Sequence, residues 1–178
     1  MSFSKLDPTL EIRLCQPSSF VQKHQPQLLP TWEKSIASTI LVLQQSSFPL
    51  TQENPELDGE KYRLRERFLR WAFPIVCQLR DTHVLTDLID PRSGYPLFSS
   101  PGEIRHDDVA AVAAILGWEI AAAGNCRAIV HPQWGTAVYP GIILSTASLP
   151  VLQSVLQDPM SLRDVPHSRE NDYRPIEK

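Results

Sequence analysis

The chain is poor in glycine and cysteine and has no excess of basic charge. Of its 178 residues, 7 are glycine, 3 are cysteine and 16 are proline. Three cysteines far apart in the sequence do not make a disulfide framework, which favours a reducing compartment. The 17 basic residues stand against 20 acidic ones, for a net charge of −3. Nucleic acid is therefore not expected as a partner.

The sequence also lacks a long hydrophobic run. No apolar stretch approaches the roughly 20 residues that span a bilayer. The opening MSFSKLDPTLEIRL has neither the apolar core of a signal peptide nor the Arg-rich pattern of a transit peptide. We therefore expect a cytoplasmic protein without membrane contact. Length and an apolar fraction of 42% predict a single domain over 1–157, with a mobile tail over 158–178.

Common catalytic and cofactor motifs are missing as well. The chain contains no G-x-G-x-x-G, no P-loop, no G-x-S-x-G, no H-E-x-x-H and no C-x-x-C. Its 5 histidines are scattered, so a metal site would need distant residues to converge. We assign no catalytic residue and no metal ligand from the sequence.

Hydrophobic periodicity predicts an α+β fold. Strands and helices are interspersed without a regular βαβ repeat, which indicates a mixed or mainly antiparallel sheet flanked by helices. Strands are predicted where residues alternate or are β-branched and apolar, at 10–15, 38–45, 83–89, 127–130 and 137–144. Helices are predicted at 18–29, 59–80 and 148–157, with a further one after Asp107.

Proline and glycine set the limits of these elements. Pro74 should kink or split the long helix, and Pro140 indicates an edge strand or a bulge. Asp107 and the next residue, also Asp, suit a helix N-terminus. The helix that follows, VAAVAAILGWEIAAAG, could end at Gly117 or at Gly124. Because it is apolar on nearly every side, we expect it to be buried or covered by a partner or a dimer mate.

Three arginines form a stripe on the long helix, away from its apolar face. These are Arg63, Arg67 and Arg70. Such a stripe is usually a solvated surface. The functional alternative is a docking site for an acidic partner or an anionic ligand.

The segment CRAIVHPQWG, from Cys126 to Gly135, concentrates thiol, imidazole and indole at a junction between two strands. In an extended strand Cys126 and His131, five positions apart, face opposite sides, so a direct Cys–His dyad is not expected. Free cysteine is often buried. We expect His131 to be a hydrogen-bonded structural residue and Trp134 to lie in the core or an interface. Whether the thiol is a nucleophile, a metal-facing group or core filler stays open.

Two segments taken together resemble a known family. The first is DLIDPRSGYPLF, whose turn contains Asp90, Pro91 and Gly94, and the second is GNCRAIVHPQWGTAVYPGIILSTA. Their order and spacing resemble those of the methylmalonic aciduria and homocystinuria type D protein family, over most of 10–156. The resemblance implies a modified flavin nitroreductase fold that has lost flavin binding.

The resemblance further implies a non-enzymatic adaptor in intracellular vitamin B12 (cobalamin) trafficking. Members of the family dock on a cobalamin-processing partner, the type C protein, and direct the cofactor to B12-dependent enzymes. No cofactor is bound tightly, and cobalamin is met through the partner. The cobalamin-facing candidates that the resemblance implies are Asn125, Cys126, His131, Trp134 and Gly135.

This sequence departs from the family at one position. Members carry two adjacent cysteines, the first of which is proposed to coordinate cobalt. Here Asn125 takes that place and Cys126 is the one that remains. A thiolate is a soft ligand for a transition metal, which an amide is not. Two alternatives therefore stay open: a small thiol-dependent redox or cobalamin-processing enzyme that uses Cys126, and an interaction module whose ligand site is lost.

Overall fold

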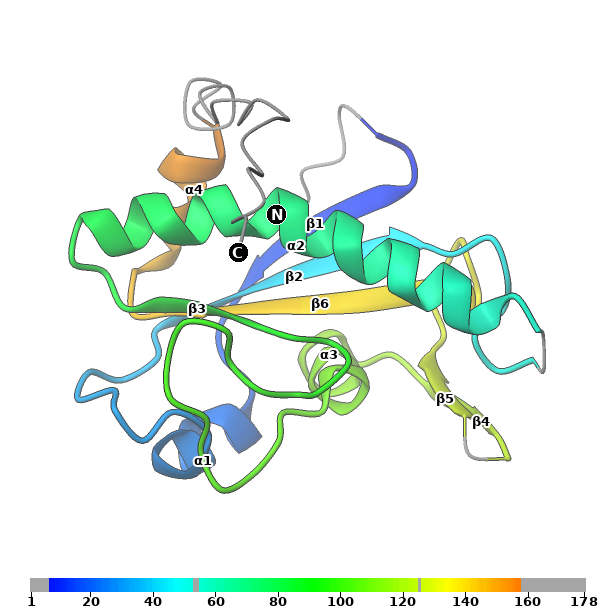
Figure 1. Ribbon diagram of the computed structural model, residues 1–178, viewed down its shortest axis with the longest axis horizontal. Helices are drawn as coiled ribbons and strands as arrows, with labels where there is room; N and C mark the ends of the chain where they lie inside the picture. Colours follow the sequence, from blue (N-terminus) through cyan, green and yellow to red (C-terminus); the bar gives the residue numbers. More distant parts are fainter. Residues whose placement is uncertain (1–6, 53–54, 125, 158–178) are drawn as a thin grey trace, which may run out of the picture.

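A computed structural model describes residues 7–52, 55–124 and 126–157 (Figure 1). In these ranges the chain forms a four-stranded antiparallel sheet in the order β1-β2-β6-β3 and a separate antiparallel ribbon of β4 and β5. The strands are β1 Leu10–Cys15, β2 Ser38–Gln45, β3 Thr86–Ile89, β4 Ile120–Ala123, β5 Cys126–Ile129 and β6 Val138–Ser145. The helices are α1 Ser19–Leu28, α2 Leu57–Asp81, α3 Asp108–Leu116 and α4 Leu149–Gln157.

Helices cover the sheet on both faces (Figure 1). The long helix α2 lies along one face, and Leu152 of α4 joins the hydrophobic cluster beneath it. Helices α1 and α3 lie against the other face, where Val21 and Val112 join a second cluster. The predicted α+β class with antiparallel pairing is confirmed. The tail predicted over 158–178 lies outside the described residues.

Strand β2 is apolar on both of its faces because both faces are covered. Successive side chains of a strand point to opposite sides of the sheet. Ile40 and Val42 accordingly pack with Phe68 of α2, whereas Leu41 and Leu43 pack in the cluster of α1 and α3. All four β2 side chains are fully buried. Each such burial contributes about 1.5–3 kcal/mol to folding.

Strand β6 is a central strand, so the edge position predicted from Pro140 is wrong. Pro140 lies in an unbroken register with β2, without a bulge. The N–H group of Thr146 donates to the Leu85 carbonyl on the β3 side. Because N–H groups alternate along a strand, the nitrogen of Pro140 faces that same side. Strand β3 has already ended there, since its last pair is Ile89 with Ile142. No ladder hydrogen bond is lost at the proline.

Helix α2 runs unbroken through Pro74, so the predicted split is wrong, whereas the alternative of a kink stays a prediction. Buried side chains on either side of the proline, Phe68 and Ile75 among them, pack on the same face of the sheet and hold the two halves together. Phe68 needs Gly141 of β6 beneath it, because a Cβ at Gly141 would lie 2.6 Å from Cδ2 of the ring.

Helix α3 ends at Gly117, which adopts a left-handed φ of 70°. The sequence left Gly117 and Gly124 as alternative ends of this helix, and the structure shows that it ends at Gly117. The apolar residues that follow form β4 instead of continuing as helix, because β5 offers them a hydrogen-bonding partner. Val112 is buried and Ile115 partly buried against the α1–α3 cluster, so the chain's own core covers much of the apolar helix.

Strand β3 is shorter than predicted over 83–89. It begins at Thr86, because His83 adopts a φ of 61° in the turn that follows α2. Within the described parts of the chain, no helix combines the length and the apolar character that crossing a membrane requires.

Candidate functional site

His131 organises the segment from Cys126 to Gly135. The residue is 3% exposed, and its imidazole stacks on Trp134 with ring centroids 4.0 Å apart and meets the edge of Trp118 at 4.9 Å. His131 and Gly135 exchange backbone hydrogen bonds of 2.8 and 2.9 Å. Gly135 adopts a φ of 55° in this tight turn, a conformation that glycine takes without strain.

The hydrogen bonds of His131 determine which ring nitrogen carries the proton. Nδ1 accepts the backbone N–H groups of Gln133 at 3.1 Å and Trp134 at 3.2 Å. The proton of the neutral ring is then on Nε2, which donates to Oε2 of Glu11 at 3.0 Å. Burial acts to raise the pKa of Glu11, but hydrogen bonds from His131 and Arg13 hold it below its usual value. Neither nitrogen of His131 is left to serve as a base.

Cys126 lies apart from this hydrogen-bonded cluster. It is the first residue of β5, where it pairs with Ala123 beside the turn of the β4–β5 ribbon, and the ribbon extends away from the main sheet (Figure 1). Its side chain is half-buried, and the core clusters of the described residues do not include it. Asn125 lies outside the described residues. Cys126 is thus neither core filler nor part of a Cys–His dyad.

The other distinctive segment, around Asp90, forms a tight turn held by that carboxylate. Oδ1 of Asp90 accepts the Nε–H of Arg65 at 2.6 Å and the backbone N–H of Arg92 at 3.2 Å. Oδ2 accepts the hydroxyl of Ser93 at 3.0 Å. Burial acts to raise the pKa of Asp90, and these hydrogen bonds outweigh it, so the pKa lies below its usual value. The turn is therefore fastened to α2 by a charged hydrogen bond.

Gly94 fastens the same turn to the start of α3. Its N–H donates to the carbonyl of Asp90 at 2.8 Å, and its carbonyl accepts the N–H of His106 at 2.8 Å. Gly94 has a φ of 73°, and a Cβ there would lie 2.6 Å from the carbonyl oxygen of His106. A larger residue would force the turn away from α3.

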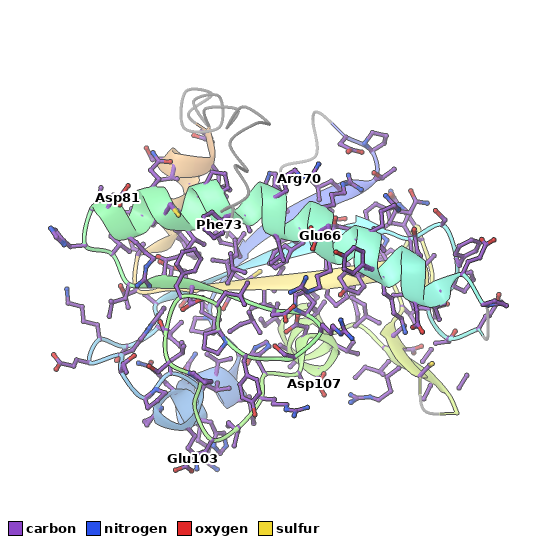
Figure 2. The ribbon with its side chains drawn as sticks, in the orientation of Figure 1. Glu66, Arg70, Phe73, Asp81, Glu103 and Asp107 are labelled. Carbon is purple, nitrogen blue, oxygen red and sulfur yellow. The ribbon has the colours of Figure 1, made fainter. Side chains whose placement is uncertain are left out.

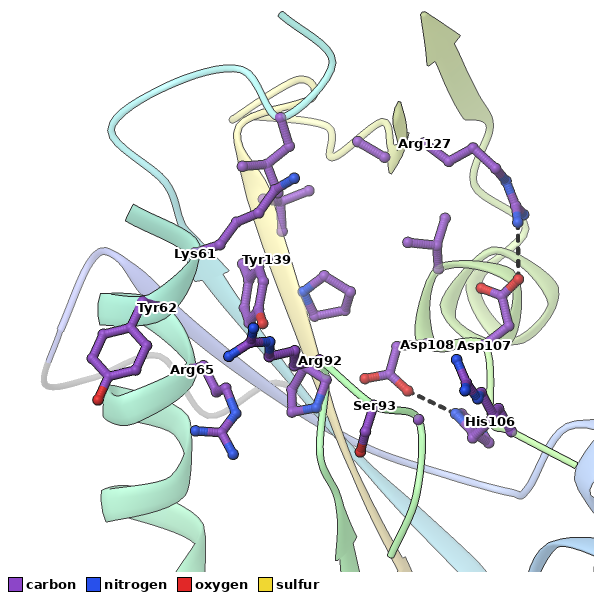
Figure 3. A pocket seen from close by; sticks show the side chains of 18 of the residues that line it. Lys61, Tyr62, Arg65, Arg92, Ser93, His106, Asp107, Asp108, Arg127 and Tyr139 are labelled. Atoms are coloured by element: carbon purple, nitrogen blue, oxygen red, sulfur yellow. Dashed lines mark hydrogen bonds and ion pairs between the residues drawn. The ribbon is translucent and has the colours of Figure 1, made fainter. Parts of the chain in front are cut away.

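A cavity of about 780 Å³ opens where the two distinctive segments meet (Figure 3). Pro91 and Gly94 line it from the turn, and Arg127 lines it from β5. Its other walls come from α2, the start of α3 and β6. Arg127 donates from Nη1 to Oδ2 of Asp107 at 2.9 Å, which ties the ribbon to the first turn of α3.

A buried polar pair lines the cavity at the start of α3. Nδ1 of His106 lies 2.7 Å from Oδ1 of Asp108, and both side chains are buried. Nε2 of His106 and Oδ2 of Asp108 have no hydrogen-bond partner among the residues described. Burial raises the pKa of Asp108 despite the opposing effect of His106. Burial also raises the pKa of Tyr139 nearby, and the charges of Asp108 and Asp90 raise it further.

The predicted arginine stripe lies along a different groove, of about 640 Å³, between α2 and the strands β1 and β2. Arg63 makes two hydrogen bonds of 2.8 Å to Glu60, and Nη2 of Arg67 donates to Asp7 at 2.5 Å. Arg70 is exposed on α2 (Figure 2). The structure brings the three arginines to one groove, but it engages two of them in ion pairs.

Sequence reasoning missed Glu11, Arg65, His106 and Tyr139. Glu11 and Arg65 form hydrogen bonds with residues far away in the sequence, and no local sequence pattern predicts such partners. His106 did have a signal, because it directly precedes the acidic helix start at Asp107. In residues 7–52, 55–124 and 126–157 no group of three or more His, Cys, Asp or Glu residues could hold a metal ion.

The fold and the site together define the class of this chain. It is an antiparallel α+β protein with helices on both faces of one sheet, in which two distinctive segments meet at a single cavity. The chain belongs to the methylmalonic aciduria and homocystinuria type D protein family, whose model matches residues 3–156. The family resemblance predicted from the two segments is confirmed.

Similar proteins point in the same direction. The chain is 29% identical over 130 residues to the cobalamin trafficking protein CblD of Rattus norvegicus, a match that covers 68% of this chain and 41% of the relative. It is 28% identical over 137 residues to the Homo sapiens protein of that name, covering 72% of this chain and 43% of the relative. The chain thus spans about two-fifths of the length of these curated relatives.

Proposed function

We propose that this protein takes part in cobalamin trafficking as a non-enzymatic adaptor that docks on a cobalamin-carrying partner. The observation that carries the proposal is the family match over residues 3–156. The names of the similar rat and human proteins, both cobalamin trafficking proteins, support the same pathway. The partner would be a type C-like cobalamin-processing protein or a B12-dependent enzyme.

The position of Cys126 supports the docking part of the proposal. A side chain that contacts a cofactor bound to another protein must be accessible at the surface, and an element that projects from the domain makes it so. Cys126 is half-buried at the turn of the β4–β5 ribbon, outside the described core clusters. As a thiolate it is a soft ligand that suits cobalt. We therefore assign the cobalt-facing role to Cys126, in place of the missing first cysteine of the family.

His131, Trp134 and Gly135 support this role by fixing the position of the ribbon that carries Cys126. Their stacked rings and closed turn fix the base of β5, and the bond from His131 to Glu11 anchors that base to β1. We further propose that the antiparallel sheet is a nitroreductase-like scaffold without flavin. The free thiols of all three cysteines are compatible with a reducing, cytoplasmic setting.

A titration of hydroxocobalamin followed in the visible spectrum tests the proposal. The chain alone should leave the spectrum nearly unchanged, and the chain added to a type C-like partner loaded with cobalamin should shift it. Cys126→Ser should abolish that shift. Cys77→Ser, which removes a half-buried thiol of α2, is the matched control and should keep it.

Two outcomes would overturn the adaptor proposal. Stoichiometric, tight binding of FMN by the purified chain would show a working flavoprotein. Conversion of cobalamin by the chain alone, lost in Cys126→Ser, would favour the thiol-dependent enzyme. A Cys126→Ser variant that still gives the full partner-dependent shift would exclude Cys126 as the cobalt ligand.

A further inference from the structure

We infer that the cavity between α2, the turn at 90–94 and the start of α3 binds a small organic phosphate ester. The inference goes beyond the adaptor function, because docking on a partner requires no small-molecule ligand. It does not involve Cys126, which does not line the cavity. Its parts are two cations without an ion-pair partner among the described residues, a buried polar pair in which each side chain has one unpartnered atom, and a volume that exceeds the size of a simple ion.

The first part is positive charge. Five cationic side chains line the cavity, against three carboxylates. Three of the cations are occupied: Arg65 by Asp90, Arg127 by Asp107, and Arg105 by the ring of Tyr95. Lys61 and Arg92 have no ion-pair partner among the described residues. Figure 3 shows both side chains on the α2 side of the cavity. Arginine and lysine at one wall suit a phosphate group, which accepts several charged hydrogen bonds at once.

The second part lies on the opposite wall. His106 is 5% exposed and Asp108 is 9% exposed, yet Nε2 of the first and Oδ2 of the second are unpaired. Figure 3 shows the carboxylate of Asp108 turned toward the space that faces Arg92. A buried polar atom without a partner is destabilising, and native proteins contain few of them. Hydroxyl or amino groups of a ligand would supply the missing partners.

The third part is the size of the cavity and the apolar share of its lining. A volume of about 780 Å³ falls within the roughly 300–1,000 Å³ of pockets for small organic molecules. The lining also includes the apolar residues Val109, Val138 and Pro140. A ligand that matches the cations on one wall and the polar pair on the other has a phosphate at one end and hydroxyl or amino groups at the other. Nucleoside and sugar monophosphates have this form.

Isothermal titration calorimetry of the full chain with AMP, ribose 5-phosphate and inorganic phosphate tests the inference. Adenosine and ribose serve as the uncharged counterparts. At least one of the two esters should bind, its uncharged counterpart should bind at least about tenfold more weakly, and raising the salt from low to physiological concentration should weaken the ester further. Inorganic phosphate alone should bind more weakly than the ester.

Variants locate the binding. Arg92→Gln, an exposed side chain whose loss leaves the core intact, should weaken the ester about tenfold. Asp108→Asn should weaken the ester and leave inorganic phosphate unchanged. Arg70→Gln, an exposed cation in the groove that α2 forms with β1 and β2, is the matched control and should bind like the wild type.

The inference is overturned if neither ester binds, if adenosine or ribose binds as tightly as its ester, or if Arg92→Gln binds like the wild type. Inorganic phosphate binding as tightly as the esters would also overturn it, because the polar pair would then have no role. These outcomes are independent of the cobalamin titration. Failure here leaves the adaptor proposal standing, and failure there leaves this one standing.

Discussion

Nε2 of His131 lies 3.0 Å from Oε2 of Glu11, across 120 residues of sequence. The bond joins the base of the β4–β5 ribbon to β1, an edge strand of the main sheet. The exposure of the two side chains is only 2% and 14%, so water does not compete strongly for either partner. At its base, the ribbon that carries Cys126 is therefore held by a buried charged hydrogen bond and an aromatic stack, in addition to the ion pair of Arg127 with Asp107.

Removing the imidazole should loosen this attachment. His131→Ala loses the acceptor for two backbone N–H groups, the donor to Glu11 and the stack on Trp134. We expect a loss of about 2–4 kcal/mol in the free energy of unfolding, measured by urea denaturation. Glu11→Gln should cost about 1 kcal/mol, and the exposed Glu33→Gln should change the stability by less than about 0.5 kcal/mol. A His131→Ala variant as stable as Glu33→Gln would contradict the structural role.

The turn at 90–94 should depend on the pair of Asp90 and Arg65 in the same way. Asp90→Asn replaces a carboxylate that accepts three hydrogen bonds, one of them from a guanidinium at 2.6 Å. We expect a loss of about 2 kcal/mol. A double-mutant cycle with Arg65→Gln should give a coupling of about 0.5–3 kcal/mol. Additive effects of the two substitutions in denaturation would show that the pair does not couple α2 to the turn.

The strands and helices that could be predicted are those whose signal is local. Strands β1 and β2 begin and end where alternation and β-branched residues place them, because a half-buried or fully buried strand carries that pattern in its own sequence. Strand β4 could not be predicted, since IAAA has no strand signal and becomes a strand through its pairing with β5. Whether Pro140 fits in a central strand likewise depends on where β3 ends, which the sequence around Pro140 does not show.

In the candidate site, too, only the residues with a local sequence signal could be predicted. The motif residues Asp90 and Gly94, and the segment around His131, are visible in the sequence because unusual residue types stand close together. Their partners Glu11 and Arg65 are ordinary charged residues on distant elements, and only the folded sheet and α2 bring them near. The cavity itself is a property of the arrangement of α2, α3 and the turn, so no single segment predicts it.

Two glycines of the chain should respond to the same substitution with opposite signs. Gly141→Ala places a Cβ 2.6 Å from the ring of Phe68 under α2, and overpacking of this kind costs about 1–3 kcal/mol. Gly59 of α2 has no atom within 4 Å of an added Cβ, so Gly59→Ala should stabilise by about 0.4–1 kcal/mol.

Thermal unfolding of the two alanine variants measures the difference. Adding Phe68→Leu to Gly141→Ala should recover part of the loss, because the smaller side chain vacates the space of the ring. If Gly141→Ala is as stable as the wild type, the Phe68 ring does not pack tightly against Gly141 of β6.

Glu60 should make the stability of the protein depend on pH in the acid range. Two hydrogen bonds from Arg63 lower the pKa of this carboxyl group from 4.5 to about 2; burial opposes the shift, and the N–H of Ser47, 2.7 Å away, assists it. A folded-state pKa below the unfolded one means that the stabilisation is complete above about pH 4.5 and is lost as the pH falls toward 2.

Glu60→Gln tests this dependence against the wild type. At pH 7 the variant should be less stable by about 1–3 kcal/mol, as for a hydrogen bond to a charged group. The gap should stay constant down to about pH 5 and close between pH 4.5 and 2, the interval between the two pKa values. Glu66→Gln, which removes a partly exposed ion pair with Arg65, should give a gap below about 1 kcal/mol throughout. Urea denaturation at several pH values measures both gaps. A Glu60→Gln gap that is the same at pH 7 and pH 2.5 would show that the carboxylate is not held by Arg63.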